Sequence, residues 1–290
     1  MEEKTSYFNI QKYLSNLEIE QGVLEHLAEV QYEFNEYFKR VFAHGQEKAL
    51  TYLTLELFNE LLYSNQIEES KITPPAEFLN TNILNNNKIL TNKRICNIQK
   101  EILKNTTMPY EIGKYRDVDV FVKRQGEIVY YAPSSSDVER FMQDFIRFYN
   151  KNTDDIINND PFIKSALIHF LFVKIHPFVD GNGRVCRILH NMKFTSLLNS
   201  TYKNKNGKEL ELKLPPLNIS YSIYNNKQSY YNKLQAIEFK KDADINYSVN
   251  RFIDFLLYMY EEQLYYNKNS HKFKNISQTI NEVKRKRKIK

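Results

Sequence analysis

Apolar residues recur every three or four positions through the N-terminal part of the chain, the spacing that places them on one face of a helix. Residues 15–42 are predicted to form one or two amphipathic helices, which end at His44-Gly45. A further helix is predicted from about Glu47 to Ile67, with leucines along one face. The chain therefore opens with a helical segment.

The persuasive strand pattern lies further along the chain. Residues Tyr115 to Val122 alternate and are rich in valine and phenylalanine, and Glu127 to Tyr131 return with isoleucine, valine and tyrosine. Lys123 to Gly126 supply the turn between them. We therefore expect one β-hairpin over residues 115–131.

Helical periodicity surrounds this hairpin on both sides. Asp160-Pro161 is a helix start, with aspartate as the cap and proline at the first helical position. The apolar run that follows ends at His176, because Pro177 disfavours helix in the residue before it. The other predicted helices cover residues 95–103, 138–149, 185–198, 222–237 and 248–266. The expected fold class is mainly α, a helical bundle with one hairpin.

Breaks in the pattern suggest three regions. We expect an N-terminal helical region over residues 1–90, a main body over 91–268, and a basic, flexible tail over 269–290. The connection between the first two is predicted at Thr73 to Thr91, which opens with two prolines and continues with many asparagines.

Composition narrows the class of protein. Only 7 glycines and 8 prolines occur in 290 residues, which favours helices. The net charge of +6 comes mostly from the tail, for which a solvated end is a simpler interpretation than nucleic-acid binding. Two distant cysteines, no secretory leader and no apolar run of membrane length predict a soluble, cytoplasmic protein.

Candidate chemistry is concentrated between His176 and Arg187, where the chain reads His-Pro-Phe-Val-Asp-Gly-Asn-Gly-Arg-Val-Cys-Arg. Gly181 and Gly183 allow backbone N–H groups to converge on one point at the start of the next helix. The partial positive charge of a helix N-terminus favours an anion there. This loop is typical of a phosphate site.

The side chains of this loop divide the chemistry among them. His176 can accept a proton from a hydroxyl, and Asp180 is a hard oxygen ligand suited to Mg²⁺. Asn182 can donate to phosphate or cap the following helix, and both interpretations stay open. Arg184 and Arg187 share a helix face and offer two guanidinium groups to phosphate oxygens. Each residue alone also has a structural interpretation, but the combination favours a site.

The stretch resembles the signature of Fic-domain proteins, His-x-Phe-x-Asp/Glu-Gly-Asn-Gly-Arg-x-x-Arg, at every specified position. The resemblance extends over roughly Ile95 to Tyr266, and its further matches are the hairpin as the family's flap, Asp160-Pro161, Ala166, His169, Ser220 and Tyr230-Tyr231. It implies a Fic fold and a nucleotidyltransferase that moves AMP from ATP to a hydroxyl side chain of a target protein.

The same resemblance implies a role for each motif position. His176 would deprotonate the target hydroxyl, and Asp180 would hold Mg²⁺. Phosphate oxygens would be held by Gly181, Asn182, Gly183, Arg184 and Arg187. The related phosphotransferases typical of Doc toxins carry alanine and lysine in place of Gly181 and Gly183, so transfer of the γ-phosphate is disfavoured here. The flap, with Tyr230 and Tyr231, would contribute to base recognition.

A second resemblance lies at the end of the predicted helix over 47–67. Ser64 to Glu68 resemble the inhibitory Ser/Thr-x-x-x-Glu-Gly/Asn motif of Fic proteins. It implies that Ser64 and Glu68 are inhibitory residues, and that Glu68 pairs with Arg187 and so excludes ATP or holds it in an unproductive pose. The chain departs from the motif at Glu69, where the family has glycine or asparagine.

Several alternatives stay open. With Glu68 orienting water, the same site would remove AMP from a modified protein instead. A nucleotide-sensing binding module with a nucleic-acid-binding tail is a different class of function, disfavoured by the intact His176 and Asp180. The target protein stays unknown, and a monomer and a homodimer are both open.

Overall fold

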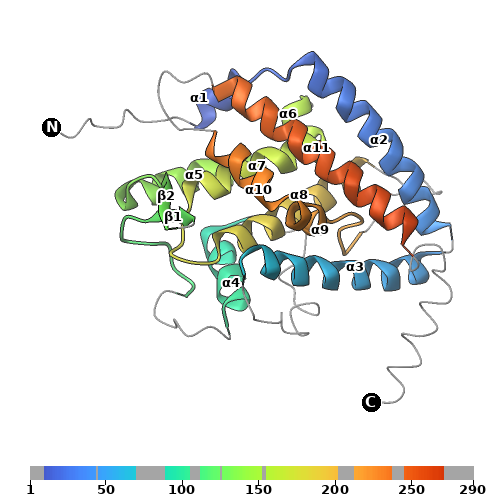
Figure 1. Ribbon diagram of the computed structural model, residues 1–290, viewed down its shortest axis with the longest axis horizontal. Coiled ribbons are helices and arrows are strands. Elements are labelled where there is room, and N and C mark those ends of the chain that lie inside the picture. Colours follow the sequence, from blue (N-terminus) through green and yellow to red (C-terminus); the bar gives the residue numbers. More distant parts are fainter. Residues whose placement is uncertain are drawn as a thin grey trace.

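The computed structural model is dominated by helices, with one small two-stranded antiparallel sheet (Figure 1). It describes residues 10–43, 45–69, 89–104, 112–124, 126–151, 155–201, 212–236 and 245–270. The predicted mainly-α class is confirmed. Most of the predicted connection, the polar residues around Gly207 and the basic end of the chain lie outside the described residues.

Two central helices, α7 (Pro161–Ile175) and α8 (Asn182–Thr201), carry the candidate site at the junction between them. The side chain of Asp160 accepts the N–H groups of Phe162 and Ile163, both at 2.9 Å, so the predicted cap starts α7. Every residue of α7 except Val173 is buried. A helix covered on all sides is a rigid support for the loop that follows it.

The N-terminal helices pack on this centre rather than forming a separate layer. Helix α2 (Gln21–Phe42) lies along α11 (Ile245–Asn269) (Figure 1). Helix α3 (Gln46–Ile67) runs below α8 in this view and contacts both α8 and α9 (Ser220–Asn225). Residues 10–15 form a separate short helix, α1 (Ile10–Ser15), that packs on α5 (Ser135–Asn150). One hydrophobic core joins all of these elements.

Aromatic rings fill much of that core. Phe34 of α2, Phe162 of α7 and Phe194 of α8 meet edge to face, with ring centroids 5.0 to 5.7 Å apart. Tyr260 of α11 packs on the last two of these rings. Phenylalanine and tyrosine thus supply the bulk of a chain without tryptophan.

The hairpin is shorter than its sequence pattern indicates. Strands β1 (Phe121–Arg124) and β2 (Glu127–Tyr131) pair antiparallel, with an irregularity after Val122. The prediction that the first strand begins at Tyr115 is wrong. Residues before the strand bond elsewhere: the N–H of Arg116 donates to the carbonyl of Pro177 at 2.9 Å, in the loop between α7 and α8.

The remaining helices are α4 (Asn92–Ile102), α6 (Ile156–Asn159) and α10 (Lys227–Gln235). The single helix predicted over 222–237 is two helices, because the Asn226 side chain donates to the Ser222 carbonyl at 2.9 Å and separates α9 from α10. Within the described ranges, no helix has the length and apolar character needed to cross a membrane.

Candidate active site

The loop between α7 and α8 is held in shape by its own residues. Asn182 accepts the N–H of Phe178 at 2.9 Å and donates its amide to the Phe178 carbonyl at 2.7 Å, so both ends of the side chain are used within the loop. Phe178 is fully buried and anchors the loop in the core. The structure therefore turns the Asn182 side chain toward the loop backbone.

Both motif glycines are required by their surroundings. Gly181 has a φ of +87°, a left-handed conformation that side chains disfavour. A Cβ added to Gly183 would lie 2.1 Å from Oε1 of Glu68, although these residues are far apart in sequence. The Glu68 side chain at the end of α3 therefore approaches the start of α8 so closely that a Cβ at position 183 would displace it.

His176 ends α7 in a left-handed conformation with a φ of +52°. Its Nδ1 lies 3.3 Å from the carbonyl oxygen of Val173, which favours a proton on Nδ1 and a lone pair on Nε2. Burial lowers the pKa of His176 to about 4, and Arg116 acts in the same direction, against Glu68 and Asp180. The imidazole is therefore neutral near pH 7 and can accept a proton.

His176 opens onto a cavity of about 720 Å³. One wall is the hairpin, with Arg124 and Tyr130, and another is α10, with Tyr230 and Tyr231. Gly183 and Glu68 line the same cavity, which thus joins the predicted base, the phosphate loop and the predicted inhibitory residue. Its volume is in the range of small-molecule sites.

Asp180 lies in the loop between α7 and α8, and 64% of its side chain is exposed. Its two carboxylate oxygens lie 3.0 and 3.1 Å from Nη2 of Arg184. No group of three or more His, Cys, Asp or Glu side chains converges within the described residues. One exposed carboxylate nevertheless fits Mg²⁺ as nucleotide sites hold it, with phosphate oxygens and water as the other ligands.

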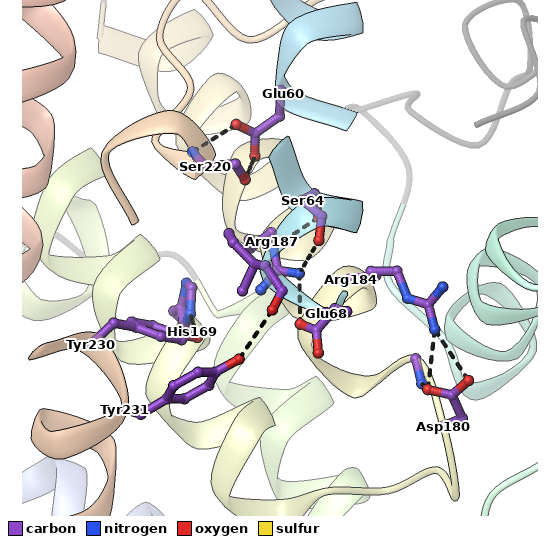
Figure 2. A network of polar contacts seen from close by, with 12 residues as sticks. Glu60, Ser64, Glu68, His169, Asp180, Arg184, Arg187, Ser220, Tyr230 and Tyr231 are labelled. Carbon is purple, nitrogen blue, oxygen red and sulfur yellow. Dashed lines mark hydrogen bonds and ion pairs between the residues drawn. The ribbon is translucent and has the colours of Figure 1, made fainter. Parts of the chain in front are cut away.

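The guanidinium of Arg187 is hydrogen-bonded to residues at the end of α3, as Figure 2 shows. Its Nε donates to Oγ of Ser64 at 2.8 Å, and its Nη2 donates to the Ser64 carbonyl at 2.9 Å and to Oε1 of Glu68 at 2.7 Å. Burial alone would lower the pKa of Arg187, but the Glu68 carboxylate outweighs it and raises that pKa. The guanidinium of Arg187 therefore stays charged despite its burial.

Two buried N–H groups of the arginines have no hydrogen-bond acceptor in the described structure. They are Nη1 of Arg187 and Nε of Arg184. Nη1 of Arg187 lies beside Gly183, since a Cβ there would be 3.1 Å from it. Unsatisfied charged donors next to a glycine backbone are suited to phosphate oxygens.

Helix α3 has further anchors that sequence reasoning missed. The buried carboxylate of Glu60 accepts the N–H and the Oγ–H of Ser220, at 2.8 and 2.6 Å (Figure 2). It also accepts the side-chain amide of Asn191 at 3.1 Å. Burial raises the pKa of Glu60. The hydroxyl of Tyr231 donates to the Ile67 carbonyl at 3.4 Å. An acid among the leucines of α3 is the signal that could have identified Glu60.

Glu69, the departure from the family's inhibitory motif, has a φ of +55°. This left-handed conformation at the end of α3 explains why glycine or asparagine suits the position. The Glu69 side chain is exposed and lies 2.8 Å from Nζ of Lys227. The chain therefore adopts the backbone of the motif with an unfavourable residue.

Tyr230 and Tyr231 lie together on α10. The hydroxyl of Tyr230 lies 2.7 Å from Nε2 of His169 in the core, and Tyr231 packs on it with ring centroids 5.3 Å apart. Arg124 of the hairpin lies 5.8 Å from the Tyr231 ring centroid. Both tyrosines therefore line the cavity from fixed positions.

Comparisons with known proteins agree with this geometry. Residues 89–193 match the Fic/DOC family. The chain is 31% identical over 115 residues to a protein adenylyltransferase Fic from Nematostella vectensis, covering 40% of this chain and 25% of that one. It is 31% identical over 134 residues to a Fido domain-containing protein from Dictyostelium discoideum, covering 39% of this chain and 90% of that one.

A solved structure of a Fic family protein from Desulfovibrio desulfuricans has the same fold, with a TM-score of 0.60 at 19% identity, covering 85% of this chain and 74% of that one. The matched region spans about a quarter of the length of the curated adenylyltransferase relatives. The signature loop, the fold and the near full-length match to the Dictyostelium protein show that this chain belongs to the Fic/DOC family.

Proposed function

We propose that the protein transfers AMP from ATP to a serine, threonine or tyrosine hydroxyl of a target protein, and that its own α3 inhibits this reaction. The observation that carries the proposal is the contact of Ser64 and Glu68 with Arg187, because Glu68 also lines the cavity onto which His176 opens. Relatives named protein adenylyltransferase Fic support the reaction type.

The chain's own residues supply the proton chemistry. Nε2 of His176 accepts the proton of the target hydroxyl, whose oxygen then bonds to the α-phosphorus of ATP. The bond from that phosphorus to the bridging oxygen breaks, and pyrophosphate leaves. The low pKa of His176 keeps the ring unprotonated at neutral pH, as a base requires.

Charge stabilisation falls to the loop and α8. The Gly181–Gly183 backbone, Arg184 and Arg187 hold phosphate oxygens, which is most of what a phosphoryl-type transfer needs from a protein. Asp180 would hold Mg²⁺, which neutralises phosphate charge when bound. Asp180 and Arg184 are paired with each other in the structure. This pair must therefore open before Asp180 can hold Mg²⁺ and Arg184 can hold phosphate.

Inhibition follows from the occupancy of Arg187. Its donors toward α3 are satisfied by Ser64 and Glu68, so a γ-phosphate at this position would meet the Glu68 carboxylate as a like charge. ATP would be excluded or held in an unproductive pose. Displacing Glu68 is the step that would activate the enzyme.

The test compares the wild type with Glu68→Gly, incubated with Mg²⁺ and ATP labelled at the α-phosphate. Self-labelling is expected to rise at least about tenfold in Glu68→Gly, and His176→Ala in the same background should abolish it. Glu69→Gln is the matched control, because it removes the neighbouring acid, which does not contact Arg187; labelling should stay near the wild-type level. No labelling by Glu68→Gly, with ATP affinity equal to that of the wild type, would overturn the inhibitory assignment.

A second candidate is removal of AMP from a modified protein. It is favoured by one observation, that the Glu68 carboxylate and His176 line the same cavity, where Glu68 can orient a water molecule. Incubating an AMP-modified target with the wild type and with Glu68→Gly separates the two reactions. Release of AMP by the wild type alone would assign hydrolysis, whereas AMP transfer by Glu68→Gly would assign the forward reaction.

A mixed experiment identifies nucleotide and target together. Glu68→Gly is incubated with ATP, UTP, GTP and CTP and a cell lysate, and modified peptides are found by mass spectrometry. The proposal expects adducts with the mass of AMP on hydroxyl side chains, absent when His176→Ala is added to the same background.

A further inference from the structure

One buried arginine outside the signature links the catalytic loop to the hairpin. Arg116 lies before β1, and none of its side chain is exposed. Its Nε donates to the His176 carbonyl at 2.8 Å, its Nη1 to the Val118 carbonyl at 3.0 Å, and its Nη2 to the Pro133 carbonyl at 2.5 Å. Three segments of the chain thus meet at one guanidinium.

The backbone of Arg116 adds a fourth tie. Its N–H donates to the Pro177 carbonyl at 2.9 Å, so His176 and the next residue are both bonded to Arg116. The conformation of His176 is left-handed, which is unfavourable for a residue with a Cβ. Such a conformation persists only where its surroundings determine it. Arg116 supplies that constraint through the two carbonyls.

The charge of Arg116 is matched by backbone carbonyls rather than by a buried acid. The nearest recorded carboxylate is Asp119, whose Oδ1 is 4.0 Å from Nη1 and whose side chain is 72% exposed. A buried charge that loses its hydrogen-bond acceptors is costly, and arginine does not deprotonate in proteins. The three carbonyls are therefore held firmly in place by the guanidinium.

Two of these carbonyls belong to the two ends of the hairpin. Val118 precedes β1 and Pro133 follows β2, so Arg116 joins both ends of the hairpin to the loop. Two further hydrogen bonds are recorded between the described hairpin residues and the helices: the Tyr130 hydroxyl donates to the Lys174 carbonyl of α7 at 2.5 Å, and Nη2 of Arg124 donates to Oδ1 of Asn232 of α10 at 3.4 Å. Neither reaches the loop after α7. Among these hydrogen bonds, only those of Arg116 connect the ends of the hairpin to His176.

We propose that Arg116 is a positioning residue for the transfer reaction: its guanidinium sets the backbone of His176 relative to the hairpin, which forms one wall of the cavity. This inference rests on the proposed function for its catalytic meaning. Arg116 does not line the cavity, so it has no contact with a nucleotide there. Its loss should reduce turnover and spare ATP binding.

The test uses Arg116→Met and Arg116→Lys in the Glu68→Gly background. Turnover of target or self-labelling is expected to fall at least about tenfold in Arg116→Met, while the dissociation constant of ATP changes less than about threefold. Arg116→Lys keeps the charge and one donor group, so its turnover should lie between that of Arg116→Met and that of the Glu68→Gly parent. A purely structural role would not split turnover from ATP binding in this way.

A second readout is independent of activity. Amide hydrogen exchange of residues 121–131 and 176–178 should accelerate about tenfold in Arg116→Met, relative to the core of α7. Lys164→Met is the matched control, because Lys164 is another fully buried basic residue whose side chain donates to a carbonyl, that of Lys151, at the far end of α7. It should lower thermal stability without accelerating exchange in the hairpin.

The outcomes separate this inference from the proposed function. If Glu68→Gly labels nothing, the proposed function fails, and hydrogen exchange still decides whether Arg116 positions the loop. If labelling proceeds and Arg116→Met matches its parent in turnover and exchange, Arg116 is not a positioning residue. Should Arg116→Met not fold, Arg116→Lys decides: parental turnover and exchange overturn the inference, and reduced turnover with unchanged ATP affinity supports it.

Discussion

Arg184 and Arg187 lie on the same face of α8, and both side chains are nearly buried, with exposed fractions of 6% and 1%. Each pairs with one carboxylate. Arg184 pairs with Asp180, which lies only four residues away in the sequence. Arg187 pairs with Glu68 of α3, which lies 119 residues away in the sequence. The first pair can open by a side-chain rotation, but Arg187 is also bonded to the Ser64 carbonyl, so freeing it fully requires the backbone of α3 to move.

This difference shows where regulation can act on the site. Asp180 is largely exposed and can leave Arg184 for a metal ion at little cost. Glu68 is 30% exposed and acts together with Ser64, and α3 is anchored behind them by Glu60. A signal that frees Arg187 therefore has to displace or unwind the last turn of α3, while Arg184 needs no such signal.

The largest expected effect comes from replacing Glu68 and Asp180, one at a time, by the amide of the same size. Glu68→Gln should lower the free energy of unfolding by about 2 kcal/mol, because it leaves the buried charge of Arg187 with neutral acceptors. Asp180→Asn should change it by less than about 0.5 kcal/mol, because that pair is open to solvent. Urea denaturation followed by circular dichroism measures both. Equal losses would show that distance along the chain does not distinguish the two arginines.

A second test exploits the close approach at Gly183. Gly183→Ala should destabilise the wild type by about 1 kcal/mol, because the added Cβ displaces the Glu68 carboxylate from Arg187. In the Glu68→Gly background the same change should alter the free energy of unfolding by less than about 0.5 kcal/mol, because the added Cβ then meets only Nη1 of Arg187, the end of a flexible side chain. The disappearance of the loss is the diagnostic result. A loss of similar size in both backgrounds would mean that Glu68 does not occupy this position.

The smallest expected effect concerns Glu69. Glu69→Gly should raise the melting temperature by about 2 °C, because it relieves the left-handed backbone at the end of α3, and should lower basal labelling further. Glu69→Ala keeps the strained conformation and loses the same contact with Lys227, so it is the control. A melting temperature no higher for glycine than for alanine would argue against strain at this position.

Local rules explain what the sequence predicted well. The start of α7 at Asp160-Pro161 and its end at His176 depend on nearest neighbours, so capping and proline rules were enough. The extent of the first strand was not a local matter. Its predicted beginning at Tyr115 failed because Arg116 bonds to the loop after α7, a partner that alternation within the strand cannot reveal.

The contacts of α3 also depend on partners that are distant in the sequence. Glu68 was identified through a family pattern, and helical spacing alone gave no reason to place it on Arg187. Glu60 was missed because its partner, Ser220, lies 160 residues further along the chain. The departure at Glu69 was visible in the sequence, but its meaning depends on a φ of +55°, which only the folded chain supplies.

Ser64, Glu68 and Arg187 belong to one polypeptide, which has a consequence for dosage. Under the inhibition that we propose, diluting the protein does not separate α3 from Arg187. Producing more protein does not raise the active fraction either, because each molecule carries one α3 at every concentration. Free copies of the same helix added from outside would compete poorly against the tethered one. The quantity that a cell would need to control is the fraction of molecules with α3 displaced, and not the amount of protein.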